Sequence, residues 1–399
     1  MDLRSGHPYW LLRNGLLQAF PPLQEDVKCD VLVVGAGITG ALVSFHLAEA
    51  GFSTVVLDQR DVAWGSTSAS TALLQYEIDT PLRELIPKLG ESHAVRAYHA
   101  CRDAIDLLRQ LTSRLPDSCD FALRPSLYVA PDKKAARELE EEFALRKQHG
   151  FNVTWWEPDT FQQHFPFERP GAIHSVEGGQ VDPYRLAYQI LTVGQSMGLR
   201  VHDRTTVTDY NVTSRGATAR TDRGFTVRAQ HIVFATGYEA TEFLDRKIVD
   251  LNSSFALVSE PLPAPLWHEE CLIWEHADPY LYFRTTADHR IVLGGEDEPF
   301  RNPAKRDALL PAKTKTLLRK FAKYFPDLPL EVAFAWAGTF GETKDGLAYI
   351  GQVPEFPRAF FTLGFGGNGM TYSILAANII RDALRGKRSP YHDLFSFQR

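Results

Sequence analysis

The chain has few cysteines, no long apolar run and no cluster of positive charge. Its four cysteines, among 399 residues, are scattered without a C-x-x-C pair or metal-ligand spacing, which predicts buried free thiols in a reducing compartment and no metal site. No stretch holds the roughly 18 apolar residues of a membrane span. A net charge of −6 without a polybasic run gives no electrostatic footprint for nucleic acid or anionic lipid.

The N-terminal residues also lack the apolar core of a secretory signal. We therefore expect a cytoplasmic protein with a small-molecule substrate, no nucleic-acid partner and no membrane span. Residues 1–28 mix aromatic residues with prolines, which predicts an extended lead-in packed across the surface of the fold. The alternative interpretation of this lead-in is a lid.

A strand, a glycine turn and a helix follow one another near the start. A β-branched run at residues 30–34 predicts a buried strand, and residues 41–50 predict a helix. Gly35, Gly37 and Gly40 lie between them in G-x-G-x-x-G spacing. Such glycines allow a tight turn, close approach of a pyrophosphate and close packing of helix on strand. The helix N-terminus then offers free N–H groups to the phosphates.

A second strand, residues 54–57, ends at Asp58. An acid at this place accepts hydrogen bonds from a ribose diol and argues against the 2′-phosphate of NADP. Strand, turn, helix and acid together predict a dinucleotide-binding βαβ unit. The alternative is a glycine-rich turn in another α/β protein.

Three later segments are further candidates for contact with a dinucleotide. The loop at residues 66–72 is rich in small hydroxyl side chains that can donate to phosphate or ribityl oxygens, although such a loop can also simply cap a helix. A buried strand at 231–234 ends in the turn Ala235-Thr236-Gly237. The glycine turn at 364–370 precedes a helix over 371–384, which again presents a helix N-terminus.

The rest of the chain alternates between helical and strand patterns. Helices are predicted over residues 81–115, 133–149, 184–198 and 302–325, and antiparallel strands over 252–297. The run Glu140-Glu141-Glu142 predicts a solvated helix face. This order predicts an α/β domain built from the start, middle and end of the chain, with an antiparallel sheet and helices (α+β) inserted twice.

Taken together, these motifs resemble the D-amino-acid oxidase superfamily of FAD-dependent oxidoreductases, which includes glycine and sarcosine oxidases. The resemblance extends from about residue 30 to residue 386. It is carried by Gly35 to Gly40, Asp58, Thr67 to Ala72, Val181-Asp182-Pro183, Ala235-Thr236-Gly237, Trp336-Ala337-Gly338, Thr343-Lys344-Asp345-Gly346 and Phe365-Gly366-Gly367-Asn368-Gly369.

The resemblance implies a Rossmann-like FAD-binding domain interleaved with an antiparallel-sheet substrate domain. The FAD-binding domain comprises residues 29–80, 170–240 and 335–399, and the substrate domain comprises 81–169 and 241–334. The AMP half of FAD would lie on the first glycine turn, and the flavin beside the last one. The implied FAD contacts are Gly35, Gly37, Ile38, Thr39, Gly40, Asp58, Gln59, Ser66, Thr67, Ser68, Ser70, Thr71, Ala72, Val207, Ala235, Thr236, Gly237, Gly338, Gly366, Gly367, Asn368, Gly369 and Met370.

The implied activity is oxidation of the C–N bond of an amine or amino-acid-like substrate. A hydride passes to flavin N5, and the resulting imine is hydrolysed, with O2 or another acceptor taking the electrons. Because the flavin carries the difficult step, no catalytic residue is named. Two alternatives remain open: oxidation of a C–O bond in a hydroxy acid or polyol, and a flavin-binding module with little activity without a partner.

The sequence departs from these relatives where they bind a substrate carboxylate. Phe340 stands in place of an arginine, and Gly367 in place of a second basic residue. An arginine–carboxylate pair is the strong way to hold an amino acid, so a small amino acid in the usual pose is disfavoured. Residues 339–343 contain no cysteine, which implies noncovalent FAD because sarcosine oxidases link their flavin near this position.

Four residues are candidates for the substrate pocket: Phe340, Glu342, Arg284 and Tyr282. Arg284 lies at the end of a predicted strand and can compensate for the missing arginines, whereas its alternative role is a surface or interdomain salt bridge. Glu342 can bind an ammonium group, and its alternative interpretation is an exposed loop carboxylate.

Overall fold

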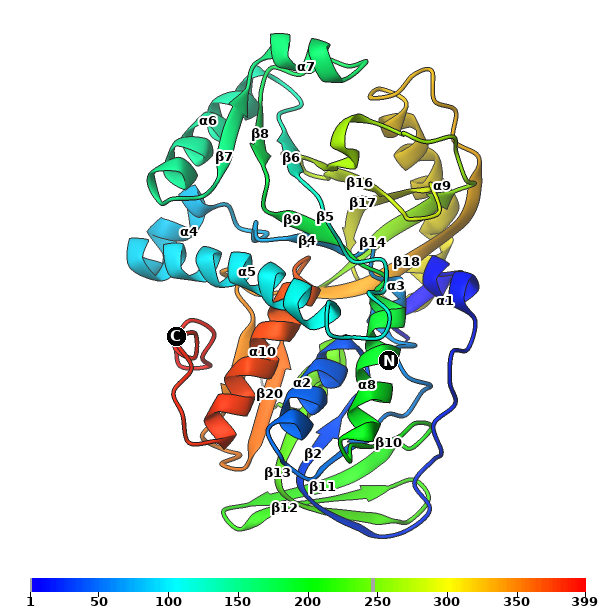
Figure 1. Ribbon diagram of the computed structural model, residues 1–399, viewed down its shortest axis with the longest axis vertical. Helices are drawn as coiled ribbons and strands as arrows, with labels where there is room; N and C mark the ends of the chain where they lie inside the picture. The colour runs from blue at the N-terminus through cyan, green and yellow to red at the C-terminus, as the bar shows by residue number, and fades with distance from the viewer. Residues whose placement is uncertain (1, 245–247) are drawn as a thin grey trace.

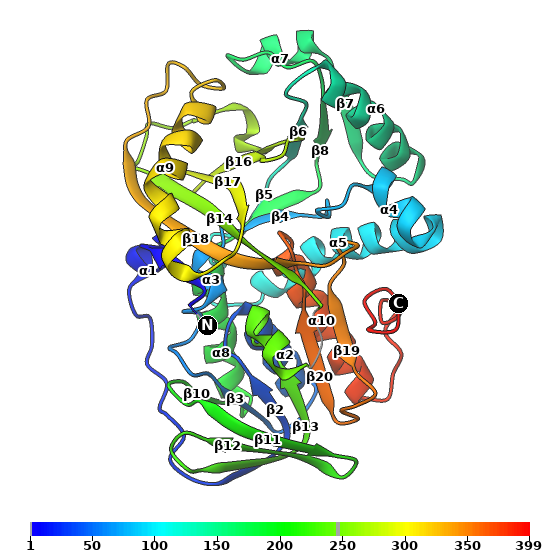
Figure 2. The same ribbon diagram turned by 180° about the vertical axis from the view of Figure 1, so that it is seen from behind.

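The structure is a computed structural model that describes residues 2–244 and 248–399, and it has a mixed α/β fold. Figures 1 and 2 show an elongated molecule in which one half is built on each of two large sheets. A small sheet lies between the halves in the order β4-β9-β5. Its strands are β4 (Leu73–Gln75), β5 (Ala122–Leu123) and β9 (Gly178–Gln180).

The first large sheet contains the predicted βαβ unit. Its eight strands are β2 (Val27–Val34), β3 (Thr54–Leu57), β10 (Arg200–His202), β11 (Val207–Thr213), β12 (Gly216–Thr221), β13 (Thr226–Phe234), β19 (Tyr349–Gln352) and β20 (Ala359–Leu363). β10, β3, β2, β13 and β20 run parallel. β3 and the last four residues of β2 are buried throughout, as strands covered on both faces require.

Three helices pack side by side on this sheet (Figure 1). They are α2 (Ile38–Glu49), α8 (Pro183–Ser196) and α10 (Gly369–Leu384). Asp182 caps α8 by accepting hydrogen bonds from the Tyr184 and Arg185 N–H groups. Residue by residue, β3 coincides with the strand predicted from the sequence, whereas α2 begins three residues earlier than predicted, directly after the glycine turn.

The second large sheet has nine strands in the order β1-β18-β14-β17-β16-β15-β6-β8-β7. They are β1 (Arg4–Gly6), β6 (Ser126–Val129), β7 (Val153–Trp156), β8 (Ala172–Ser175), β14 (Asp250–Ser259), β15 (Leu272–Glu275), β16 (Leu281–Thr285), β17 (Ile291–Pro299) and β18 (Val332–Glu342). All neighbours are antiparallel except β6 and β15. This is the antiparallel sheet expected for the second domain.

Helices of the second half surround this sheet. They are α4 (Leu82–Leu89), α5 (Glu91–Thr112), α6 (Lys133–Gln148), α7 (Pro158–His164) and α9 (Pro303–Phe321), with short helices α3 (Ser66–Ala69), η1 (Gly237–Phe243) and η2 (His268–Glu270) elsewhere. The predicted helix over 81–115 is divided at Gly90, where φ is +82°. No helix in the described part of the chain combines the length and apolarity needed to cross a membrane.

The strand pairing places parts of two segments of the expected FAD-binding domain, 170–240 and 335–399, in the nine-stranded sheet. β8 pairs with β6 and β7, and β18 pairs with β14 along its whole length. Both strands therefore belong to the nine-stranded sheet, since backbone pairing decides sheet membership.

The N-terminal lead-in is neither wholly extended nor superficial. β1 pairs with β18, and α1 (Tyr9–Asn14) follows it. Tyr9 and Trp10 are almost completely buried. The lead-in is therefore part of the packed core where the two halves meet.

The prediction of a solvated face at residues 140–142 is wrong for Glu142. Its side chain is fully buried and pairs with Arg146 Nε at 2.7 Å. The same carboxylate accepts hydrogen bonds from the N–H groups of Leu82 and Arg83, at the start of α4. Glu142 is buried because α4 packs its N-terminus against α6, a contact that the charge pattern of α6 does not reveal.

Candidate active site

A cavity of about 440 Å³ extends from the glycine turn after β2 to strands of the nine-stranded sheet. This volume lies in the range of about 300–1,000 Å³ that ligand pockets occupy. Its wall combines the first sheet's glycine turns with Ser254 and Ala256 of β14, Tyr282 of β16 and Phe340 of β18. The cavity thus joins the two halves of the molecule.

The first glycine turn is shaped by contacts that exclude side chains. Gly35 has a φ of +105°, and a Cβ there would lie 2.4 Å from the Ala235 carbonyl oxygen. A Cβ on Gly40 would lie 1.8 Å from the Gly35 carbonyl oxygen. The turn therefore needs glycine both for its backbone conformation and for the close packing of α2.

Asp58 holds this turn together. Its Oδ2 accepts a hydrogen bond from the Ala36 N–H at 2.6 Å, and its Oδ1 accepts one from the Arg60 N–H at 2.8 Å. Burial raises the pKa of Asp58 to about 6, and these two N–H groups oppose that shift. Arg60 in turn pairs with Glu239 at 2.8 Å, so a charged cluster surrounds the nucleotide end of the cavity.

The hydroxyl-rich loop lies against the same turn. Thr67 Oγ1 accepts a hydrogen bond from the Ile38 N–H, the first of α2, at 2.9 Å. Ser66 Oγ and Thr236 Oγ1 line the cavity and are buried without a hydrogen-bond partner among the described residues. Unpaired buried hydroxyls on a cavity wall fit a polar ligand such as a dinucleotide, because an unsatisfied buried polar group is costly.

The late glycine turn brings a second helix N-terminus to the cavity. α10 begins at Gly369, and Asn368 before it donates through Nδ2 to the Glu77 carbonyl oxygen at 2.8 Å. Thr39 Oγ1 and Ser373 Oγ lie 2.7 Å apart and join α2 to α10. Both helices therefore direct their N-terminal ends toward one ligand.

The structure brings most of the expected FAD contacts to the cavity wall. All line it except Gly40, Ser68, Ala72 and Asn368, which are not on the wall. Among the substrate candidates, Tyr282 and Phe340 line the cavity, whereas Arg284 and Glu342 do not. Lining residues that sequence reasoning missed include Leu3, Arg60, Tyr238, Glu239, Ser254 and Tyr280. Only Tyr280 carried a usable signal, its place two residues before Tyr282.

Arg284 does not line the cavity; its guanidinium binds backbone carbonyl groups instead. It is buried and donates to the carbonyl oxygens of Thr71 and Val181 at 2.7 and 3.2 Å. Its guanidinium lies 5.3 Å from the centre of the Trp10 ring. Burial lowers the pKa of Arg284 to about 10. These contacts occupy the side chain with backbone from both halves.

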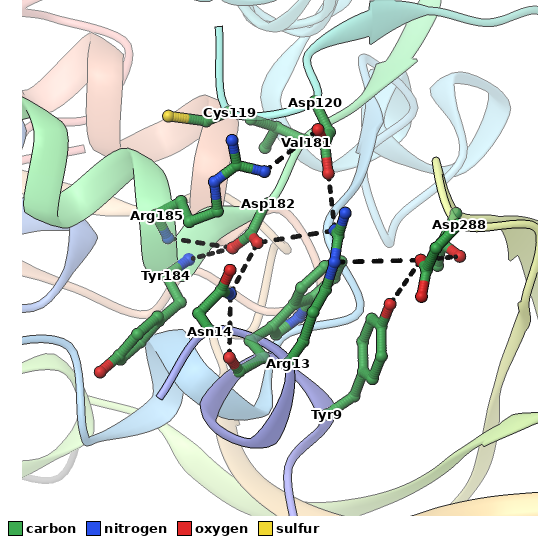
Figure 3. A network of polar contacts seen from close by, with 12 residues as sticks. Tyr9, Arg13, Asn14, Cys119, Asp120, Val181, Asp182, Tyr184, Arg185 and Asp288 are labelled. Atoms are coloured by element: carbon green, nitrogen blue, oxygen red, sulfur yellow. Dashed lines mark hydrogen bonds and ion pairs between the residues drawn. The ribbon is translucent and has the colours of Figure 1, made fainter. Parts of the chain in front are cut away.

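Figure 3 shows how α1 closes this region. Arg13 reaches Asp120 at 2.6 Å and lies 3.8 Å from Asp182, while Asn14 donates to Asp182 Oδ2 at 2.8 Å. The Tyr9 hydroxyl donates to Asp288 Oδ1 at 2.6 Å. α1 therefore ties Asp182, at the start of α8, to Asp288, between β16 and β17.

The two glycine turns, the hydroxyl loop and the unpaired hydroxyls define an FAD-dependent oxidoreductase fold and site. The chain belongs to the DAO family, "FAD dependent oxidoreductase", whose model matches residues 30–383. FAD is its cofactor, and its enzyme class is an oxidase or dehydrogenase acting on amine-type donors. None of the four cysteines, all within the described part of the chain, lines the cavity, in agreement with noncovalent FAD.

Named relatives agree with this assignment. The chain is 26% identical to gamma-glutamylputrescine oxidoreductase of Escherichia coli, over 92% of this chain and 86% of that protein. It is 24% identical to glycine oxidase of Geobacillus kaustophilus, over 93% and 96%, respectively. The crystal structure of that glycine oxidase superposes with a TM-score of 0.77 at 23% identity, covering 93% of this chain and 99% of the other.

A third comparison is with the L-amino acid deaminase of Proteus myxofaciens in complex with anthranilate. Its TM-score is 0.80 at 15% identity, covering all of this chain and 98% of the other. This likeness concerns the fold. The family prediction, the mixed α/β fold and the FAD cofactor are thereby confirmed.

Proposed function

We propose that the protein oxidises a C–N bond of a small amine that lacks the carboxylate of a free amino acid. FAD, which the two glycine turns and the hydroxyl-rich loop would hold, would supply the acceptor for a hydride from the C–H next to nitrogen. The substrate is left as an iminium ion, which water converts to a carbonyl compound and a free amine. The electrons leave the flavin to O2 or another acceptor.

The observation that supports this proposal is the composition of the cavity wall beyond the glycine turns. Ser254, Tyr280, Tyr282 and Phe340 line that part. Among the described residues, Arg60 is the only basic side chain on the wall, and it is engaged with Glu239 at the nucleotide end. A substrate carboxylate would therefore meet aromatic rings instead of an arginine.

The chain's own residues bind and orient the substrate. The aromatic rings exclude water from the carbon chain of an amine, and Ser254 Oγ, which lacks a hydrogen-bond partner, can accept from or donate to a neutral amino group. The relatives named for glycine and gamma-glutamylputrescine support amine-type chemistry.

The test is anaerobic reduction of the flavin. The purified holoprotein should be yellow and release its flavin on acid precipitation. Mixing with a panel of primary and secondary amines, amino acids, hydroxy acids and polyols should bleach the flavin absorbance only with amines that lack a carboxylate. Bleaching by a hydroxy acid or polyol, with none by any amine, would contradict the proposal and support C–O oxidation.

A further inference from the structure

Three carboxylates lie together beside the substrate end of the cavity. Asp79 follows β4, Asp297 lies near the end of β17, and Glu342 is the last residue of β18. Repulsion from Asp79 raises the pKa of Glu342, repulsion from Glu342 raises that of Asp297, and repulsion from Asp297 raises that of Asp79. Segments more than 200 residues apart in the sequence are thus brought to one place.

Asp79 covers the late glycine turn. Its Oδ2 accepts a hydrogen bond from the Gly367 N–H at 2.8 Å, and a Cβ on Gly366 would lie 1.9 Å from that same oxygen. The side chain is exposed to open space next to Gly366 and Gly367, which line the cavity. An acid therefore occupies the helix N-terminus that bounds the substrate end.

Glu342 continues the cavity-lining face of β18. Trp336, Gly338, Thr339 and Phe340 line the cavity, and Glu342, two residues after Phe340, lies on the same face of β18 as Phe340 because side chains alternate along a strand. Its Oε2 accepts a hydrogen bond from Asn252 Nδ2 at 3.0 Å. The carboxylate is thus held by a neutral amide instead of a cation.

The buried polar atoms beside Asp297 are a second indication of a ligand, and one of them, Ser254 Oγ, lies outside the three acids. The preceding residue, Glu296, faces α9 and pairs with Lys313 and Lys320 at 3.5 and 2.5 Å. Asp297 has no such ion pair among the described residues, and its Oδ1 is buried; its polar neighbours are the hydroxyl groups of Ser254 and Tyr280, which oppose the rise in its pKa. The Oγ of Ser254, on the cavity wall, is also buried and unpaired.

Among the described residues, no lysine or arginine forms an ion pair with the group called here the acidic triad (Asp79, Asp297 and Glu342), and the one cation that lowers the pKa of Asp297, Lys313, pairs with Glu296 and Glu298. Burial raises the pKa of Asp79 and of Asp297 to about 6, and that of Glu342 to about 7, and repulsion within the triad adds to each shift. Asp297 and Glu342 are half-buried and Asp79 is exposed, and carboxylates that repel one another in a partly enclosed site are stabilised by a cation between them.

The surroundings of the acidic triad suit an organic cation better than a metal ion. Among the described residues, no three acids, cysteines or histidines are placed to hold one metal ion. The rings of Tyr280 and Tyr282 stack with centres 5.6 Å apart and border the cavity, and aromatic faces attract organic ammonium groups. A spread of carboxylates with aromatic rings suits an alkylammonium chain.

The reaction separates the roles of two nitrogens. The nitrogen next to the reacting C–H must be neutral, because its lone pair forms the C=N bond as the hydride leaves. Carboxylates hold a nitrogen in its protonated form instead. The cation bound by the triad is therefore a second nitrogen of the same molecule.

We propose, on the basis of the amine oxidation proposed above, that the substrate is a diamine or polyamine whose non-reacting ammonium group is bound by the acidic triad. One nitrogen reacts as the neutral amine, and the far one pairs with Asp79, Asp297 and Glu342. The aromatic rings of Tyr280 and Tyr282 lie along the alkyl chain between them.

The first arm of the test uses substrates of one chain length that differ only at the far end. Butylamine, 1,4-diaminobutane and 4-aminobutanoate carry a methyl, an ammonium and a carboxylate group there, and diaminopropane and diaminopentane vary the length. We expect kcat/KM of the best diamine to exceed that of the matched monoamine by about 10- to 100-fold. Equal values, or a preference for the carboxylate, would overturn the proposal.

The second arm removes the charges one at a time. Asp297→Asn, Glu342→Gln and Asp79→Asn should each raise KM for the diamine about tenfold or more, and should raise the KM of the monoamine much less. Glu298→Gln is the matched control, since Glu298 pairs with Lys313 at 2.8 Å on the opposite side. An equal effect of the control would mean that general charge, not the triad, attracts the diamine.

A binding measurement separates failure of this inference from failure of the proposed function. The oxidised holoprotein is titrated with 1,4-diaminobutane by calorimetry, and the triad variants should weaken binding. Triad-dependent binding without flavin bleaching would support the cation site and contradict amine oxidation. Bleaching by amines without any triad-dependent binding would support amine oxidation and overturn the acidic triad's role.

Discussion

The backbone N–H of Gly367 donates a 2.8 Å hydrogen bond to Oδ2 of Asp79. A carboxylate therefore contacts the glycine turn that leads into α10, at the position where the family resemblance implies a basic residue. The helix N-terminus stabilises negative charge, so the fold itself supports the acid at this position. The substrate end of the cavity therefore carries a negative charge at the position where the family resemblance implies a positive one.

Replacing Gly366 by alanine should displace Asp79. The new Cβ would lie 1.9 Å from Asp79 Oδ2, at a backbone φ of +51°. We expect KM for a diamine to rise about tenfold, and the free energy of unfolding to fall by about 1–3 kcal/mol. Steady-state kinetics and urea unfolding measure the two effects.

Two further variants separate strain from the loss of the acid. Gly386→Ala has a similar φ of +67° with no atom within 4 Å of its Cβ, and should lose stability without a change in KM. Adding Asp79→Ala to Gly366→Ala should relieve the clash but leave KM high. Recovery of a low KM in the double variant would show that Asp79 is not what binds the diamine.

The preference for diamines should depend on pH. Because the pKa of Asp79 and Asp297 is raised to about 6 and that of Glu342 to about 7, the triad is ionised above pH 7 and loses charge below it. The neighbouring Tyr238, Tyr280 and Tyr282 have pKa values raised by burial, so they stay neutral throughout. The ratio of kcat/KM for diamine over monoamine should therefore fall as pH drops from 8 to 5, since the ratio cancels the titration of the reacting amine.

The free energy of unfolding of the ligand-free protein should depend on pH in the opposite sense to the diamine preference. A carboxyl group whose pKa is higher in the folded state contributes stability at low pH that is lost as pH rises through the folded pKa. Because 1,4-diaminobutane binds the ionised carboxylates of the folded protein, adding it should raise Tm more at pH 8 than at pH 5. A larger Tm shift at pH 5 would contradict ionised carboxylates as the binding groups.

Gly40→Ala tests the first glycine turn. Alanine normally stabilises a helix by about 1 kcal/mol relative to glycine, but here its Cβ would lie 1.8 Å from the Gly35 carbonyl oxygen. We expect the variant to be purified without flavin, as measured by absorbance after acid precipitation. Gly51→Ala, just after the same helix and with no atom within 4 Å of its Cβ, should keep its full flavin content.

Arg284→Met distinguishes a structural arginine from a substrate ligand. Removing the guanidinium leaves the carbonyl oxygens of Thr71 and Val181 without this donor, so the free energy of unfolding should fall by about 2–4 kcal/mol. Arg109→Met, which removes an exposed i,i+3 pair with Asp106, should cost less than about 1 kcal/mol. A stable Arg284 variant with a raised KM for a carboxylate substrate would show that Arg284 binds substrate after all.

Local patterns predicted most of the residues that line the cavity at its glycine turns. The glycine turn at Gly35 to Gly40 and the acid at Asp58 are encoded within about thirty consecutive residues, because a turn and its flanking strands depend mainly on nearby residues. β3 and the position of α10 followed for the same reason. The hydroxyl loop lies beside the turn as expected, but α3 (Ser66–Ala69) forms its first residues and the strand β4 follows it.

Side chains buried by distant segments could not be predicted in the same way. Glu142 has a charge pattern typical of a solvated helix face, and only the packing of α4 against α6 buries it beside Arg146. Arg284 is a candidate substrate ligand by sequence, whereas in the structure its guanidinium packs against the ring of Trp10 in α1. A periodic pattern identifies the face of an element, but not what lies against that face.

The sequence by itself determined the cofactor, the family and the places where the family's arginines are missing. The tertiary structure decided what occupies the substrate end instead. Asp79, Asp297 and Glu342 come from three segments, and each alone is an ordinary acid in the sequence. They act together only because β17 and β18 flank β14 in one sheet, while the segment after β4 rests on the turn before α10.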